Sequence, residues 1–268
     1  MLNLQARRQS GVSLVELMVG IVVGLIVLLG ISSVYVNSAR SSRTATAANQ
    51  LNQDMRAMMD IMVNDLRRAG FWSTAVTGTN PFTAAATNIR ITSPAANNDC
   101  ILYSYDAPFA GAPNGAVDTG TDFFGFRLTG GAIQTLQSTT ITSTATVCAN
   151  INADSWSTLT DNRAIAVTRL TFDSVGSRCI AFVQASYDPS NAATFTTWTT
   201  TAGTTAACNE TVNNNNAAAS VTAVAAAGNN FMETRQIQIT LTANSLVDTT
   251  LTRTLTETVL VRNNRLIP

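Results

Sequence analysis

The sequence contains no histidine and no lysine, and charged residues make up only 12% of its 268 positions. Histidine is the base in Ser-His-Asp and Cys-His catalytic arrangements and the commonest ligand of catalytic zinc, so these classes of site are excluded. A two-carboxylate hydrolase needs no histidine, but the acidic residues are scattered and no pair of them can be placed in one cleft. We therefore predict no catalytic residue, no cofactor-binding residue and no metal ligand.

Excess charge of either sign is also lacking. All 16 basic residues are arginine, they are balanced by 16 acidic residues, and the formal net charge is zero. A nucleic-acid-binding surface needs a concentration of basic residues. We therefore predict no direct binding of nucleic acid.

Proline is absent before Pro81, and Glu16 is the only charged residue between Leu14 and Ile31. About 20 apolar residues in a helix span a hydrocarbon core of about 30 Å. The sequence therefore predicts one long helix from residue 12 to about residue 69, in which residues 12–35 cross a membrane and residues 36–70 continue beyond it. A carboxylate in hydrocarbon costs roughly 2.5–3.5 kcal/mol, which makes Glu16 a candidate functional residue.

The residues around this carboxylate form a motif. A short leader with Arg7 and Arg8 ends at Gly11, Val12 follows, and Glu16 stands four positions further on. This pattern, followed by a long apolar helix, resembles the N-terminus of type IV prepilins, although that family usually has phenylalanine where this chain has Val12. The resemblance implies that prepilin peptidase removes residues 1–11 and methylates the new terminus at Val12. It also implies that Glu16 pairs with the amino terminus of a neighbouring subunit.

Other uses of an apolar N-terminal segment remain open. A cleaved secretory signal has an apolar core of about 7–15 residues, which is shorter than the run in this chain. An ordinary signal anchor needs only the positive-inside rule, which Arg7 and Arg8 satisfy. Such an anchor would give a periplasmic enzyme or binding protein that keeps its leader and has no use for Glu16.

The second half of the predicted helix has one apolar face. The residues on this face recur at steps of three and four, as the 3.6-residue period requires, and they are Leu51, Met55, Met58, Met62 and Leu66. We predict that this face packs on a globular domain and that the helix ends near Gly70, after a basic pair. The segment Asp65–Phe71 resembles the helix end of PilW-type minor pilins and of J-type pseudopilins.

Beyond Gly70 the chain shows short alternating apolar runs. Strict alternation is typical of strands with one buried face, and an Asn244–Asp248 turn would join the last two strands as an antiparallel hairpin. The sequence thus predicts an α+β fold, in which a long N-terminal pilin helix packs on a mainly antiparallel β domain formed by residues 71–268. The predicted strands are Ile101–Tyr105, Phe123–Leu128, Ala164–Phe172, Cys179–Val183, Arg235–Ala243 and Thr250–Arg262.

Three stretches rich in threonine, alanine and asparagine are expected to form long surface loops, and they are Thr74–Asn98, Tyr187–Thr205 and Asn209–Asn230. The segments Asp118–Asp122 and Asn97–Asp99 have oxygen ligands but do not match the calcium loop of an EF-hand. We interpret both as ordinary turns in which aspartate or asparagine caps the backbone.

The four cysteines are Cys100, Cys148, Cys179 and Cys208, and no two of them form a C-x-x-C motif. An even number of cysteines in an exported domain indicates two disulfides. Three pairings are possible. Sequential pairing, Cys100 with Cys148 and Cys179 with Cys208, is favoured because it closes the two polar insertions.

The size of the domain, its helix end and its terminal hairpin resemble a PilW-family minor pilin. The resemblance implies a non-enzymatic subunit that waits in the bacterial inner membrane with its domain in the periplasm and later enters the pilus at the cell surface. Its partners would be prepilin peptidase, other minor pilins, the major pilin and a tip adhesin. Its role would be to initiate pilus assembly, on which twitching motility, adhesion and DNA uptake depend. The alternatives are a J-type pseudopilin of a type II secretion system and a tip lectin that binds through its polar loops.

Overall fold

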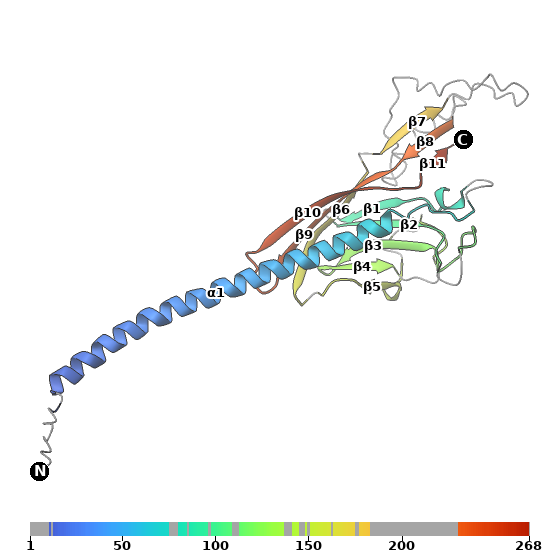
Figure 1. Cartoon of the computed structure of the whole chain (residues 1–268). Coiled ribbons are helices and arrows are strands. Elements are labelled where there is room, and N and C mark those ends of the chain that lie inside the picture. Colours follow the sequence, from blue (N-terminus) through green and yellow to red (C-terminus); the bar gives the residue numbers. More distant parts are fainter. Residues whose placement is uncertain are drawn as a thin grey trace, which may run out of the picture. The chain divides into compact units, whose positions relative to one another are not determined.

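A computed structural model describes residues 11, 13–74, 80–84, 86–95, 98–108, 113–136, 141–144, 148, 151–161, 163–174, 177–182 and 230–267. The chain divides into two compact units, Met1–Ala48 and Asn49–Pro268. A single helix, α1 (Leu14–Leu66), begins in the first unit and ends in the second (Figure 1).

The part of α1 in the first unit presents apolar side chains to its surroundings. Its large apolar residues from Leu14 to Val36 are between 44% and 75% exposed. The most apolar window of 18 residues has a mean hydropathy of 2.8, so the helix is long and apolar enough to cross a membrane. The backbone N–H of Leu17 donates to the carbonyl oxygen of Ser13 at 3.1 Å, so the helix begins immediately after the leader motif.

In the second unit, α1 packs on a β-sheet through its methionine-rich face. The predicted apolar face is confirmed, because its five residues from Leu51 to Leu66 are between 0% and 4% exposed. They lie in one core with Leu170, Ile239 and Leu241, which come from the central strands of the sheet. Burial of each such side chain contributes about 1.5–3 kcal/mol, so this face attaches the helix firmly to the sheet.

The main sheet has the strand order β10-β9-β6-β2-β3-β4-β5, and β1 also pairs with β2 (Figure 1). All pairs are antiparallel except β2 with β6, where Asn98 lies opposite Leu170. A second, smaller sheet has the order β11-β8-β7. The bounds are β1 Arg90–Ala95, β2 Asn98–Ser104, β3 Phe123–Thr129, β4 Ala132–Leu136, β5 Trp156–Thr158, β6 Ile165–Asp173, β7 Arg178–Phe182, β8 Asn230–Thr234, β9 Gln236–Ser245, β10 Thr252–Leu260 and β11 Arg265–Ile267. Short 3-10 helices span Pro81–Thr83 and Ala153–Ser155.

The predicted α+β fold is confirmed, with differences in detail. The stretch Thr74–Asn98 is wrong as a loop, because it contains a 3-10 helix, β1 and the first residue of β2. The predicted strands did not include β1, β4, β5, β8 or β11. The terminal hairpin exists, but its turn comes later than predicted, since β9 continues to Ser245 and Asn244 pairs with Thr252. Most of the other two predicted loops lies outside the described residues.

Strand β2 is buried on both faces. Ile101 and Tyr103 point into the core beneath α1, whereas Cys100 and Leu102 belong to a second apolar cluster with Trp156. Successive side chains of a strand alternate between the two faces of the sheet. The sheet is therefore covered on both sides around β2, and six of the seven residues of this strand are buried.

Candidate processing and assembly site

Gly11, where the predicted leader ends, lies three residues before the start of α1. Gly11 is exposed, and a Cβ atom placed on it would have no other atom within 4 Å. Val12, the predicted new terminus, lies outside the described residues. Glu16 lies in the first turn of α1, where the partial positive charge of the helix N-terminus favours a carboxylate.

Glu16 is the one acidic side chain on the apolar part of this helix. The next charged residue after it is Arg40, and Glu16 itself is exposed. Among the residues that the structure describes, no cation lies within ion-pair distance of it. In an apolar environment this carboxylate needs a positive partner, and its own helix supplies none nearby.

At its other end, α1 stops at a glycine that the surrounding structure requires. Gly70 has a φ of +73°, a conformation that other residues adopt only with strain. Its N–H donates to the carbonyl oxygen of Ser104 at 2.8 Å, and its carbonyl oxygen accepts from Nδ2 of Asn80 at 2.8 Å. The helix end is therefore bonded to β2 and to the segment that follows the helix.

A buried arginine reinforces this helix end. Arg235, which is 0% exposed, donates from Nη1 to Oδ1 of Asn88 at 2.6 Å and from Nη2 to the carbonyl oxygen of Asn263. Nδ2 of Asn263 donates in turn to the carbonyl oxygens of Arg68 and Ala69, at 3.3 and 3.2 Å. Arg68 and Ala69 belong to the turn that follows α1, so the C-terminal part of the chain holds the turn in which the helix ends.

The last turn of α1 also binds two tyrosines. Both carboxylate oxygens of Asp65 accept hydrogen bonds, one from the hydroxyl of Tyr103 and the other from that of Tyr105 at 3.0 Å. Arg68 forms an ion pair with Asp65, and its guanidinium carbon lies 4.8 Å from the centre of the Tyr105 ring. Burial, and then the charge of Asp65, raise the pKa of both tyrosines, so the two phenols remain protonated donors.

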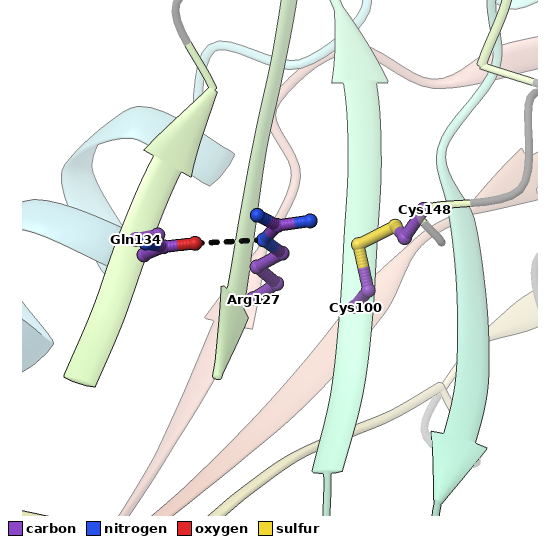
Figure 2. The surroundings of a disulfide bond; sticks show 4 residues. All are labelled: Cys100, Arg127, Gln134 and Cys148. Atoms are coloured by element: carbon purple, nitrogen blue, oxygen red, sulfur yellow. Dashed lines mark hydrogen bonds between the residues drawn. A yellow bond between two sulfur atoms is a disulfide. The ribbon is translucent and has the colours of Figure 1, made fainter. Parts of the chain in front are cut away.

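The opposite face of the sheet holds a disulfide. Cys100 on β2 is bonded to Cys148, with 6.4 Å between their Cα atoms. Arg127 on β3 pairs with Cys100 on β2 and donates from Nε to Oε1 of Gln134 at 2.8 Å (Figure 2). Its guanidinium carbon also lies 4.2 Å from the centre of the Trp156 ring. Desolvation lowers the pKa of this arginine. The structure thus contains one of the two favoured disulfides. Cys179 lies in β7, whereas Cys208, its predicted partner, lies outside the described residues.

Two buried carboxylates organise the loop between β2 and β3. Asp106, which is 2% exposed, accepts from the N–H and hydroxyl of Ser73 and from the N–H groups of Asn114 and Gly115. Burial alone would raise the pKa of Asp106, but these donors outweigh it and hold the pKa below its usual value. Asp122 accepts from the N–H groups of Asp118 and Ala107, yet desolvation raises its pKa.

The two segments with potential calcium ligands, Asp118–Asp122 and Asn97–Asp99, also use their carboxylates to accept hydrogen bonds within the domain. Asp118–Asp122 forms a turn, as predicted, and Oδ2 of Asp118 accepts from Nδ2 of Asn114 at 2.6 Å. The turn predicted at Asn97–Asp99 is wrong for its last two residues, because they begin β2; Asp99 accepts from the hydroxyl of Ser93 and from the N–H of Phe172. Asn97 lies outside the described residues. Within the part of the chain that the structure describes, no three side chains of the metal-binding types come together.

Replacement of Asp106 by asparagine should destabilise the chain at neutral pH. Hydrogen bonds to a charged group contribute about 1.5–3 kcal/mol, and asparagine can keep only the neutral part of this network. Because the folded-state pKa of Asp106 is lowered, its contribution is present above the usual value of 3.8 and is lost as pH falls through the folded pKa. Urea unfolding of the detergent-solubilised chain should show a penalty that shrinks below about pH 3.8.

The matched control is Asp122→Asn, because the pKa of Asp122 is raised rather than lowered. Asparagine resembles the protonated form of Asp122, which folding already favours. The loss of stability in Asp122→Asn should therefore be smaller at neutral pH than in Asp106→Asn, and it should not shrink on acidification. An Asp106→Asn penalty that stays constant down to pH 3 would contradict the role given to the Asp106 carboxylate.

The hydrogen-bond networks around Asp65 and Arg235 were not predicted from the sequence. Tyr103 and Tyr105 alternate within one predicted strand, which indicates a shared face but not a carboxylate partner. Arg235 precedes a strictly alternating strand, a place where a charged residue is ordinarily exposed. Its burial depends on Asn88 and Asn263, which are far from it in sequence.

Two family profiles match this chain. The first is described as "Prokaryotic N-terminal methylation motif" and matches residues 6–32, the leader motif and the apolar start of α1. The second is described as "Prepilin peptidase-dependent protein B" and matches residues 44–261, from the end of the first unit to the last strand of the main sheet. No curated protein and no solved structure matches the chain significantly.

Proposed function

Because this chain belongs to the prepilin peptidase-dependent protein B family, we propose that it is a PilW-type minor pilin that joins the complex initiating a type IV pilus. The chain is a pilin-like prepilin processed by prepilin peptidase, and its family consists generally of structural proteins rather than enzymes. The methylation motif and the apolar helix indicate an inner-membrane anchor before assembly. What we propose beyond family membership is that the chain is a non-catalytic minor pilin of the pilus tip.

The observation that carries this proposal is a fully apolar helix surface with a single carboxylate in its first turn. While the chain is in the membrane, acyl chains cover this surface. After cleavage behind Gly11, helices of neighbouring subunits replace the lipid, so the helix never meets water. Glu16 then pairs with the amino terminus of a neighbour and sets the axial register, which uniform apolar packing cannot do.

The size of the second unit supports a minor rather than a major subunit. A domain that extends from Asn49 to Pro268 is large for a position repeated throughout a tightly packed filament. The partners are then prepilin peptidase, the other minor pilins, the major pilin and a tip adhesin. Twitching motility, adhesion and DNA uptake belong to the assembled machine.

A second candidate is a J-type minor pseudopilin of a type II secretion system. The segment Asp65–Phe71, where α1 ends, resembles the helix end of both classes. The Thr- and Asn-rich insertions favour the pilus over this candidate. Deletion of the gene distinguishes the two, because a pilus subunit is needed for twitching and a pseudopilin for secretion.

The proposal is tested by intact mass spectrometry of the membrane-extracted protein from cells with and without prepilin peptidase. We expect loss of residues 1–11 and a gain of one methyl group, both dependent on the peptidase. We also expect the deletion strain to lose surface pili and twitching, to keep secretion, and to recover when the wild-type gene is returned. Normal piliation in the deletion strain, or loss of secretion instead, would overturn the minor-pilin assignment.

A further inference from the structure

An open groove lies between α1 and the loop that joins β5 to β6. Its volume is about 240 Å³, and both of its walls belong to the second unit. Met58 and Ile61 of α1 and Ile165 of β6 give it an apolar lining. Ile61 is 46% exposed, which leaves a large apolar side chain in contact with solvent at the groove.

Each wall of the groove also presents one carboxylate. Asp54 comes from the helix and Asp161 from the loop. Asp161 accepts the N–H of Arg163 at 2.9 Å, which fixes its orientation but does not neutralise it. Among the described residues, no cationic side chain lies within ion-pair distance of either carboxylate. The groove therefore combines apolar surface with uncompensated negative charge.

A side chain that suits this combination has an apolar stem and a positive head. Arginine meets both requirements, because its methylene groups cover apolar surface while its guanidinium binds carboxylates with a defined geometry. A flat or wholly apolar ligand would leave both carboxylates beside a low-dielectric surface without a partner. The apolar lining and the two carboxylates of the groove thus favour a cationic side chain with an apolar stem, carried on a segment whose other side chains are small.

We propose that this groove binds an arginine on the N-terminal helix of a neighbouring pilin-like subunit that lies further outward in the assembly. This inference rests on the proposed function. The chain itself shows what such a helix looks like, because Arg40 and Arg43 are exposed and no acidic residue occurs between Glu16 and Asp54. The residues around these arginines are mostly serine, threonine and alanine, whose small side chains allow close helix approach.

The register set by Glu16 is consistent with this contact. When the amino terminus of one subunit, at position 12, pairs with Glu16 of the next, parallel helices are staggered by four residues. After three such steps, positions 40 and 43 of the outward helix stand level with Asn52 and Met55, which flank Asp54. A neighbour with an arginine at this distance from its own terminus therefore meets the groove with no change of register.

The direction of the stagger has a consequence for the order of subunits. The occupant of the groove is shifted toward the C-terminal end of α1, so it lies further out than this chain. The chain is consequently not the outermost subunit of the complex. By the same register, its own Arg40 and Arg43 would serve a subunit three steps further inward.

The test is site-specific photo-crosslinking in cells that express the full chain and prepilin peptidase. A benzoylphenylalanine at Ala57, an exposed residue in the groove, should crosslink to the N-terminal helix of another pilin-like subunit, near an arginine identified by peptide mass spectrometry. The same probe at Asn64, exposed on α1 but outside the groove, is the matched control and should not give this product. Asp54→Arg or Asp161→Arg should lower the yield about tenfold, whereas Asp60→Arg should leave it unchanged.

Three results would overturn the proposal. These are a product with a protein that has no pilin-like helix, a product with a second copy outside its N-terminal helix, and no product from chains that are processed and incorporated. In the last case the proposed function stands and only the groove assignment fails. A chain that keeps its leader and stays out of filaments would remove the proposed function and the groove assignment together.

Discussion

A Gly11→Leu chain should keep its leader completely. We propose that cleavage follows Gly11, and a large side chain there would then occupy the space in which the peptidase holds the bond. Gly11 is exposed and has no atom within 4 Å of its Cβ position, so the substitution should not disturb the chain itself. Intact mass spectrometry of membrane extracts should show only the uncleaved form, and sheared filaments should contain none of the variant.

Gly20→Ala is the control for this experiment, because Gly20 also has an open Cβ position but lies within α1. It should be cut as completely as the wild-type chain. If the Gly11→Leu chain loses residues 1–11 at a rate near that of the wild type, the predicted requirement for glycine before the cut is wrong.

A Glu16→Gln chain should be processed normally and then fail to assemble. If Glu16 pairs with a neighbour's amino terminus, as we propose, its removal costs about 3–5 kcal/mol, because that amino terminus remains charged and buried without a partner. A cost of this size reduces incorporation by a factor of roughly 10²–10⁴, because each 1.4 kcal/mol corresponds to a factor of ten. The measurement is the ratio of variant in sheared filaments to variant in the membrane.

Two further variants sharpen this experiment. Glu16→Asp keeps the charge on a shorter side chain and should recover part of the incorporation, whereas Ser13→Ala removes a neighbouring polar group and should change little. Normal assembly of Glu16→Gln would show that register comes from other contacts. An unprocessed Glu16→Gln chain would instead place the effect at the peptidase.

The features predicted correctly are those with a strong local period. The face from Leu51 to Leu66 repeats every three or four residues, and the alternation in β9 is strict, so both gave the right element and the right buried side. The overall α+β fold follows from one long helix and several short strands. Four cysteines allow three sets of disulfide pairs, and the bond between Cys100 and Cys148 occurs in only one of them, the sequential pairing that was favoured.

The features missed depend on contacts between distant segments. Strand β1 has only two large buried apolar residues near its start, Ile89 and Ile91, which is too few for a recognisable alternation. Strand β5 has three residues and exists because it pairs with β4. The parallel pairing of β2 with β6 joins strands separated by β3, β4 and β5, and no local pattern specifies it. The groove between α1 and the β5–β6 loop likewise has no signature in the sequence.

The way in which the end of α1 is held matters for how the subunit bears force. If the chain enters a filament, as we propose, tension on its helix is borne by the contacts between that helix and the domain. One set of contacts is the face from Leu51 to Leu66, which packs on the sheet. A second set holds the turn after α1, because Asn263 donates to the carbonyl oxygens of Arg68 and Ala69 and is held in turn by the buried Arg235. Residues near the C-terminal end of the sequence therefore share the load with the sheet, although Asn263 is 195 residues beyond Arg68.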